Sequence, residues 1–142
     1  MGMVEYQKSA FDAAEQEIGD GAPIYMVNLI RYRAEAQYLN DDASEPSSGS
    51  GKEVYFQRYV PAFARVAEGE DYSVFWVGNI RGLLVAAPGE HWDDIVIVKY
   101  ASIQTLRRIL ESPDYETQAA PHRRAALEDW RFIVTTKVDL PG

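Results

Sequence analysis

Three features of the 142-residue sequence predict an α+β protein with a four-stranded antiparallel sheet. Helical and strand patterns follow one another in the order helix, strand, helix, strand, strand, helix, strand. Two of the strand segments, IYMVNLI and IVIVKY, carry apolar side chains on both faces. The length suits a single domain, residues 1–142, with a sizeable core. After an extra N-terminal helix the order is β-α-β-β-α-β, which is the ferredoxin-like pattern.

The first half of the chain supplies two helices and one strand. Residues 9–18 form a short amphipathic pattern that the glycines after it end. Residues 24–30 are rich in β-formers and predict the first strand. Residues 53–67 predict the second helix, in which Pro61 deletes one backbone hydrogen bond and favours a kink.

Between the first strand and the second helix the sequence is polar. This segment contains NDDASEPSSGSGK, which is too rich in glycine, serine and charge to pack. We expect residues 40–52 to form a flexible surface loop, which is either a plain insertion or a lid over a site. Limited proteolysis should cut this loop first.

The next part of the chain supplies two or three strands and the third helix. Residues 72–86 predict two strands or one bent strand, with Gly78 or Gly82 marking a bulge or turn. Residues 94–100 are a further strand. Residues 102–110 have the apolar spacing of a helix.

A last helix and a last strand occupy residues 112–136. Ser112 can cap the helix and Pro113 suits its first position. Pro121 interrupts the helical pattern. The β-formers that begin at Phe132 predict the final strand.

The strand patterns also predict a homodimer. An antiparallel sheet with one face in water should alternate apolar and polar residues, and IYMVNLI and IVIVKY do not. Helices can cover one face of the sheet. Because the available helices are few, we expect a second copy of the chain to cover the other face.

Composition excludes several classes of protein. The net charge is −8, whereas a nucleic-acid-binding surface needs clustered lysine and arginine. The absence of cysteine removes disulfides and thiolate chemistry and fits a reducing cytoplasm, where we place the protein. No apolar run approaches the roughly 20 residues that span a bilayer, and the N-terminus lacks the apolar region of a signal peptide. We therefore expect neither nucleic acid nor a membrane as a partner.

Several short motifs along the chain occur together. They are Asn28-Leu29 with Arg31, Tyr55 and Tyr59, Trp92-Asp93, Tyr115, His122-Arg123, Leu127, Asp129 and Arg131. This set resembles the uncharacterised bacterial family of dimeric α+β barrel proteins catalogued as domain of unknown function thirteen-thirty. The resemblance covers residues 22–138 without the loop. It implies a ferredoxin-like subunit and a homodimer whose two sheets close a barrel, and it implies no established reaction. The chain departs from the family by placing Pro121 directly before His122.

The wider superfamily includes cofactor-free monooxygenases, muconolactone isomerases, heme-degrading monooxygenases and chlorite dismutases. The heme degraders use an asparagine on the first strand, a tryptophan on a helix and a histidine on a later helix. Asn28 and His122 are similar to two of these residues, but Ile109 stands where the tryptophan should be. We therefore expect no heme degradation and no cofactor.

Two polar residues are the candidates for catalysis. An unperturbed histidine titrates near neutral pH, so His122 suits proton transfer, although a histidine that caps a helix or bonds across an interface is the structural alternative. Asn28 is polar in an apolar strand, and its amide needs either a substrate oxygen or neighbouring backbone. Asp129 would lie about 10 Å from His122 on a continuous helix, too far for a direct pair. We expect replacement of His122 or Asn28 to weaken ligand binding more than stability.

Four further residues are candidates for contacting a ligand. Trp76 can line a cavity, and Arg123 or Arg131 can hold an anionic group. Tyr59 is the fourth candidate for binding a substrate. The structural alternatives are core packing for the tryptophan and ion pairs with nearby carboxylates for the arginines. The two histidines are too few for a metal site, so we expect none.

The sequence therefore favours a small-molecule-binding protein. Its catalytic form would be a cofactor-independent monooxygenase or isomerase that acts on a small apolar or aromatic substrate, an inference from superfamily analogy. In that hypothesis Asn28 orients a substrate oxygen and His122 moves a proton. The alternative is a non-catalytic ligand-binding or interaction module, and the sequence leaves open whether the protein is an enzyme.

Overall fold

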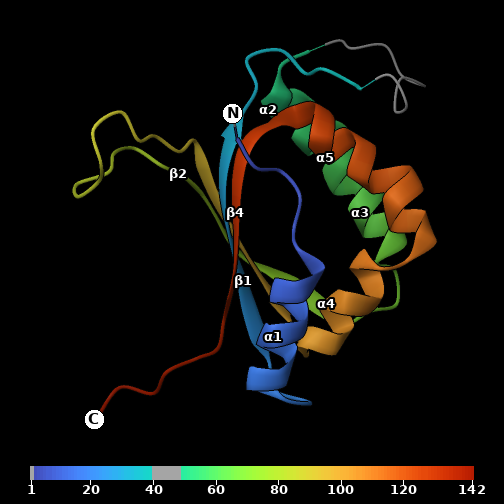
Figure 1. The fold of residues 1–142 in the computed structure, drawn as a ribbon, viewed down its shortest axis with the longest axis vertical. Coiled ribbons are helices and arrows are strands. Elements are labelled where there is room, and N and C mark those ends of the chain that lie inside the picture. Colours follow the sequence, from blue (N-terminus) through green and yellow to red (C-terminus); the bar gives the residue numbers. More distant parts are fainter. Residues whose placement is uncertain (1, 40–48) are drawn as a thin grey trace.

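The computed structural model of the chain describes residues 2–39 and 49–142. It contains an antiparallel sheet with helices packed on one of the two faces (Figure 1). The sheet has the order β2-β3-β1-β4, which is the order of a ferredoxin-like unit, so the predicted fold class is confirmed. The strands are β1 (Ile24–Tyr32), β2 (Tyr72–Asn79), β3 (Asp94–Tyr100) and β4 (Leu127–Thr135).

The helices form an N-terminal element, a short element after β3 and two longer runs. Each longer run contains a π-helical turn. The elements are α1 (Lys8–Ile18), α2 (Gly51–Val54), the π turn η2 (Tyr55–Tyr59), α3 (Val60–Val66), α4 (Ile103–Leu110), the π turn η3 (Tyr115–Ala119) and α5 (Ala120–Ala126). Within the described ranges, none of these helices combines the length and apolar character that crossing a bilayer requires. The predicted flexible loop falls largely on residues 40–48, which lie outside the described residues.

Side chains alternate across the central strand β1, as the pleat of a strand requires. Ile24, Met26, Asn28 and Ile30 face the helices and are buried. The residues between them point to the opposite face of the sheet. All helices drawn in Figure 1 lie on one side of the sheet, so this opposite face stays uncovered within the chain.

Strand β2 differs from the predicted glycine-marked bulge. The pairing of β2 with β3 shifts between Val74 and Trp76, which makes Phe75 the extra residue. Gly78 instead leaves room for the indole of Trp76, because a Cβ on Gly78 would lie 2.5 Å from Nε1 of that indole. After β2 the chain leaves the sheet, and residues 80–93 project from it as an arm (Figure 1, yellow).

The two prolines inside helical runs are accommodated by π turns. In each run the residue before the proline donates its N–H to the carbonyl of a tyrosine five residues earlier. The residue before Pro61 donates to Tyr55, and the residue before Pro121 donates to Tyr115. A proline ring collides with the carbonyl four residues before it in an α-helix, and the wider π turn moves that carbonyl away. The helices therefore continue through both sites, in place of the predicted interruption at Pro121.

Strand β4 begins earlier than the sequence pattern predicts. The β-formers place its start at Phe132, but Leu127 already pairs with Tyr32 of β1. Pairing along the central strand decides this start, because extending the pair adds ladder hydrogen bonds at alternate residues. Asp129 therefore lies on a strand, and the helical spacing expected between it and His122 does not apply.

Gly51 lies at a joint of three backbone segments. Its N–H donates to the carbonyl oxygen of Arg33 at 3.0 Å, and the N–H of Arg33 donates to that of Ala126 at 2.9 Å. A Cβ on Gly51 would lie 2.3 Å from the Ala126 oxygen and 2.5 Å from the Arg33 oxygen. Backbone cannot move aside as a flexible side chain can. The joint therefore fixes the start of α2 against the ends of β1 and α5.

We expect Gly51→Ala to lower the free energy of unfolding by about 1–3 kcal/mol, because it overpacks a closed backbone joint. Gly82→Ala is the matched control, since a Cβ at Gly82 meets no atom within 4 Å. Chemical denaturation of both variants measures the difference. Equal stability of the two would mean that the joint tolerates a side chain.

Candidate functional site

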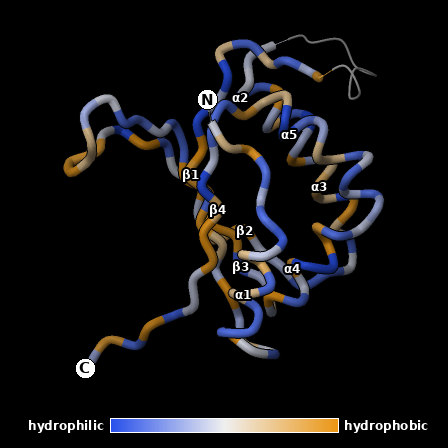
Figure 2. Tube along the Cα trace, in the orientation of Figure 1, coloured by the Kyte–Doolittle hydropathy of each residue, from blue (hydrophilic) through white to orange (hydrophobic). Residues whose placement is uncertain are grey.

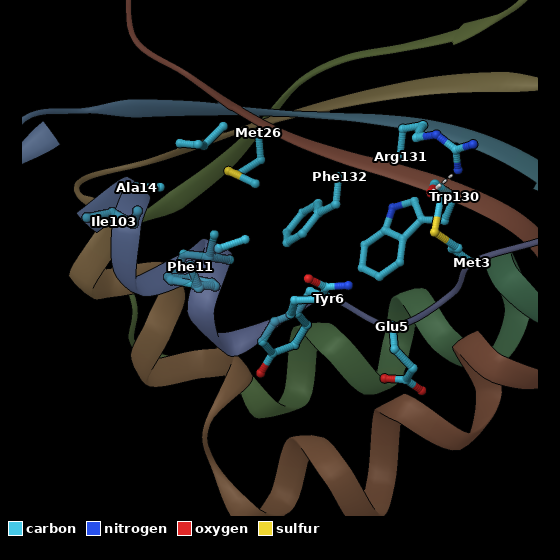
Figure 3. Close-up of a pocket in the computed structure, with 14 residues that line it drawn as sticks. Met3, Glu5, Tyr6, Phe11, Ala14, Met26, Ile103, Trp130, Arg131 and Phe132 are labelled. Atoms are coloured by element: carbon cyan, nitrogen blue, oxygen red, sulfur yellow. Dashed lines mark hydrogen bonds between the residues drawn. The ribbon is translucent and has the colours of Figure 1, made fainter. Parts of the chain in front are cut away.

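Two cavities lie between the sheet and the helices. The inner cavity has a volume of about 130 Å³ and lies under η2, α3 and η3. Its lining includes Asn28, Tyr59, Phe63, Val98, Tyr115 and Trp130. The N-terminal cavity has a volume of about 280 Å³ and lies between β4, α1 and the N-terminal segment (Figure 3). Its lining includes Met3, Tyr6, Phe11, Met26, Trp130 and Phe132.

Asn28 reaches the inner cavity from the middle of β1 and is held by two hydrogen bonds. Its Nδ2 donates to the carbonyl oxygen of Val96 at 3.1 Å, and its Oδ1 accepts from Nε1 of Trp130 at 2.9 Å. The side chain is buried, so these partners meet the requirement of a buried amide. Asn28 thus fixes the orientation of the indole that walls both cavities.

Arg123 starts a buried chain of hydrogen bonds that ends at the inner cavity. Its side chain is only 2% exposed, and its Nη1 donates to the hydroxyl oxygen of Tyr115 at 2.6 Å. The hydroxyls of Tyr115 and Tyr59 lie 2.8 Å apart, and both residues line the cavity. On its other side Arg123 Nη2 donates to Glu5 at 2.8 Å. The charge of the guanidinium is therefore paired although it is buried.

Burial sets the proton chemistry of the tyrosines in this chain. It raises the pKa of Tyr59 well above the ordinary value of a phenol, and the neighbouring Tyr115 and Tyr55 raise it further. Burial likewise raises the pKa of Tyr55. The Tyr59 phenol stays protonated at neutral pH, so it can form hydrogen bonds to a ligand but does not act as a base.

Trp130 contacts Asn28, Arg123 and Phe132. Its ring lies 5.1 Å from the Arg123 guanidinium carbon and 4.7 Å, centroid to centroid, from the ring of Phe132. Together with its hydrogen bond to Asn28, these contacts restrain the indole on several sides. Figure 3 shows the rings of Trp130 and Phe132 side by side above the N-terminal segment.

The structure places Arg131 beside a tryptophan and a carboxylate. Its guanidinium lies 5.1 Å from the ring of Trp92, and its Nη1 donates to Asp129 Oδ1 at 2.7 Å. Burial raises the pKa of Asp129, but hydrogen bonds from the Met3 N–H and from Arg131 outweigh it and hold this pKa below its ordinary value. Arg131 also borders the N-terminal cavity.

Trp76 and His122 lie away from both cavities. Trp76 projects from the uncovered face of the sheet and is 58% exposed. The Nδ1 atom of His122 lies 2.7 Å from the hydroxyl of Tyr38, which also accepts a hydrogen bond from Arg58 at 2.9 Å. The structure therefore brings Asn28 and Tyr59 together at the inner cavity but places His122 in a separate cluster.

Sequence reasoning did not select Tyr115 and Trp130 as site residues. Trp130 and Phe132 are two residues apart on a strand, so both side chains lie on the same face. This spacing is the signal that could have identified them as lining the same cavity. Tyr115 gave no such signal, because the π turn that directs it inward is not visible in the sequence. In the described ranges, no three histidine or acidic side chains group closely enough to hold a metal ion.

Comparison with solved structures shows the family. The RPA0582 protein of Rhodopseudomonas palustris, a protein of unknown function, shares 30% sequence identity with this chain at a TM-score of 0.81. The match covers 99% of this chain and 100% of that one. The chain belongs to the same family as RPA0582. A structure of methylated RPA0582 gives the same identity and TM-score over 97% of this chain and 96% of its own.

Another solved structure is less similar to this chain. A dimeric protein of unknown function with a ferredoxin-like fold from Bacteroides fragilis is 14% identical. Its TM-score is 0.40 over 81% of this chain and 96% of that one. No protein-family model matches the sequence, and no curated protein matches it. RPA0582 is itself of unknown function, so membership of its family assigns no reaction to the chain.

The hydrogen bond between Asn28 and Trp130 can be tested by a double-mutant cycle. The sequence predicted little effect of Asn28 on stability, but the two buried partners change that expectation. Asn28→Ala should lower the free energy of unfolding by about 1–3 kcal/mol, because the indole N–H and the Val96 carbonyl lose a buried partner. Trp130→Phe removes the same N–H, so the two effects should be non-additive by about 0.5 kcal/mol or more. Additive losses would show that the hydrogen bond does not contribute to stability.

Proposed function

We propose that this chain binds a small single-ring aromatic ligand in the inner cavity. The observation that carries the proposal is a largely apolar cavity of about 130 Å³ whose lining includes Asn28 and the hydrogen-bonded tyrosines Tyr59 and Tyr115. Binding sites for small molecules combine a mostly apolar lining with a few convergent polar groups. An engineered apolar cavity of roughly 150 Å³ accepts benzene, so the volume suits one ring.

The surrounding residues would give such a ligand an orientation. Phe63 and Val98 offer apolar contacts, and the Tyr59 hydroxyl offers a hydrogen bond to an oxygen on the ring. The lining also includes Ala64 and Val74, which are exposed. We therefore propose that the ligand enters the inner cavity from solvent between α3 and β2.

A cofactor-independent monooxygenase or isomerase is the second candidate function. The buried chain Arg123–Tyr115–Tyr59 favours it, because a guanidinium behind two phenols stabilises negative charge that develops on a substrate oxygen. Among the described lining residues of the two cavities there is no histidine. His122 would thus have no direct part in such a reaction, and binding is the function that the geometry supports best.

Phenol is a suitable probe for the inner cavity. We expect titration with phenol to shift the methyl NMR signals of Val96 and Val98 and to raise the melting temperature. Ala64→Phe should abolish both responses, because it places a ring at an exposed position of the cavity lining. Ala10→Phe is the matched control, since Ala10 is exposed and lines the N-terminal cavity. Unchanged methyl signals in the wild type at millimolar phenol would refute the proposal.

We further propose that the chain is a homodimer and that the uncovered face of the sheet is its interface. Phe75 and Trp76 of β2 and Ile133 of β4 are 63%, 58% and 43% exposed. The 80–93 arm carries a further apolar tip, with Leu84 99% exposed (Figure 2). Exposed apolar surface of this kind marks an association site. A second copy suits it, because identical faces can pack on each other about a two-fold axis.

Light scattering after size exclusion tests the dimer. The wild type should have twice the subunit mass of 16.0 kDa. Trp76→Lys and Ile133→Lys place charges on the proposed interface and should each yield the single-subunit mass at micromolar concentration. Leu39→Lys, at an exposed apolar residue after β1, should remain a dimer. A monomeric wild type would contradict the proposal.

We also propose a finer family assignment for the chain. The dimeric α+β barrel family thirteen-thirty is supported by the motif residues Asn28, Tyr59 and Tyr115, which meet at one cavity in this fold. If a set of short motifs describes one site, its residues should meet in the folded chain although they lie on separate elements.

A further inference from the structure

The two cavities share one wall. Leu106, Trp130 and Phe132 line both of them, whereas Met26 lines the N-terminal cavity and Val98 the inner one. Figure 3 shows the ring of Phe132 between Met26 and the indole of Trp130. The cavities are thus adjacent chambers that a few side chains separate.

The three wall residues differ in how firmly they are held. Trp130 donates a hydrogen bond to Asn28 and packs under the guanidinium of Arg123. Leu106 lies on α4 and is fully buried, at 0% exposure. Phe132 is partly buried and has no polar group, so its ring can rotate or be removed without leaving a hydrogen-bonding group unsatisfied. Phe132 is therefore the part of the wall that can open.

We propose that Phe132 determines the length of the ligand by dividing one elongated site into two chambers. This inference rests on the proposed function and deepens it. With the Phe132 ring in place, the inner cavity of about 130 Å³ takes a single aromatic ring. Without that ring the inner cavity joins the N-terminal cavity of about 280 Å³, and the site accepts a fused two-ring aromatic compound.

Phenol and 2-naphthol are matched probes, because they differ by one fused ring and share a hydroxyl. Phe132→Ala should tighten the binding of 2-naphthol by about tenfold and change that of phenol by less than about threefold, as measured by NMR titration. Phe132→Leu should give a smaller gain in the same direction, and it retains more packing should the alanine variant fold poorly. Phe11→Ala is the control, since Phe11 lines the N-terminal cavity but not the inner cavity. It should leave the preference between the probes unchanged.

The position of the bound ring system gives an independent readout. In Phe132→Ala, intermolecular nuclear Overhauser effects from 2-naphthol should reach both the Met26 methyl and the Val98 methyls, which belong to different chambers. If phenol binds the wild type while neither Phe132 variant gains affinity for 2-naphthol, the divider role is overturned and the proposed function stands. If phenol binds neither the wild type nor the variants, both are overturned.

Discussion

The hydrogen bond between the Asn28 amide and the Trp130 indole is the interaction on which the interior of this protein depends. It joins the central strand β1 to its neighbour β4 through side chains, beyond the backbone ladder. A buried amide and a buried indole N–H each require a partner, and here each is the partner of the other. Because the indole is fixed, Arg123 can pack on one side of it and Phe132 on another. The positions of both cavities follow from that arrangement.

The helical layer reaches this interior through two π turns. A proline inside a helix normally ends or bends it, yet both prolines here follow a turn that is one residue wider. Each turn begins at a buried tyrosine, Tyr55 or Tyr115. Tyr115 then links the Arg123 guanidinium to Tyr59. The same local irregularity that tolerates proline thus places Tyr59 and Tyr115, two of the polar residues that line the inner cavity.

The two faces of the sheet have different roles. The helix-facing side is filled by large aromatic and aliphatic residues and encloses the cavities. The opposite side exposes Phe75, Trp76 and Ile133 beside an arm with an apolar tip. Exposed apolar side chains are costly in water when they are contiguous, and for this reason these residues form the proposed dimer interface.

The sequence by itself determined the order of elements, the fold class and the apolar character of both sheet faces. These depend on local periodicity and on capping residues such as Ser112, whose Oγ accepts the N–H of Asp114. The start of β4 at Leu127 and the bulge at Phe75 were decided by pairing with neighbouring strands, which local propensity does not contain. The candidate site divides in the same way. Asn28 could be selected because it is a polar group on an apolar strand, and Tyr59 belongs to the motif set of the resemblance. Only tertiary packing separates both from His122 and supplies Trp130 as the shared wall.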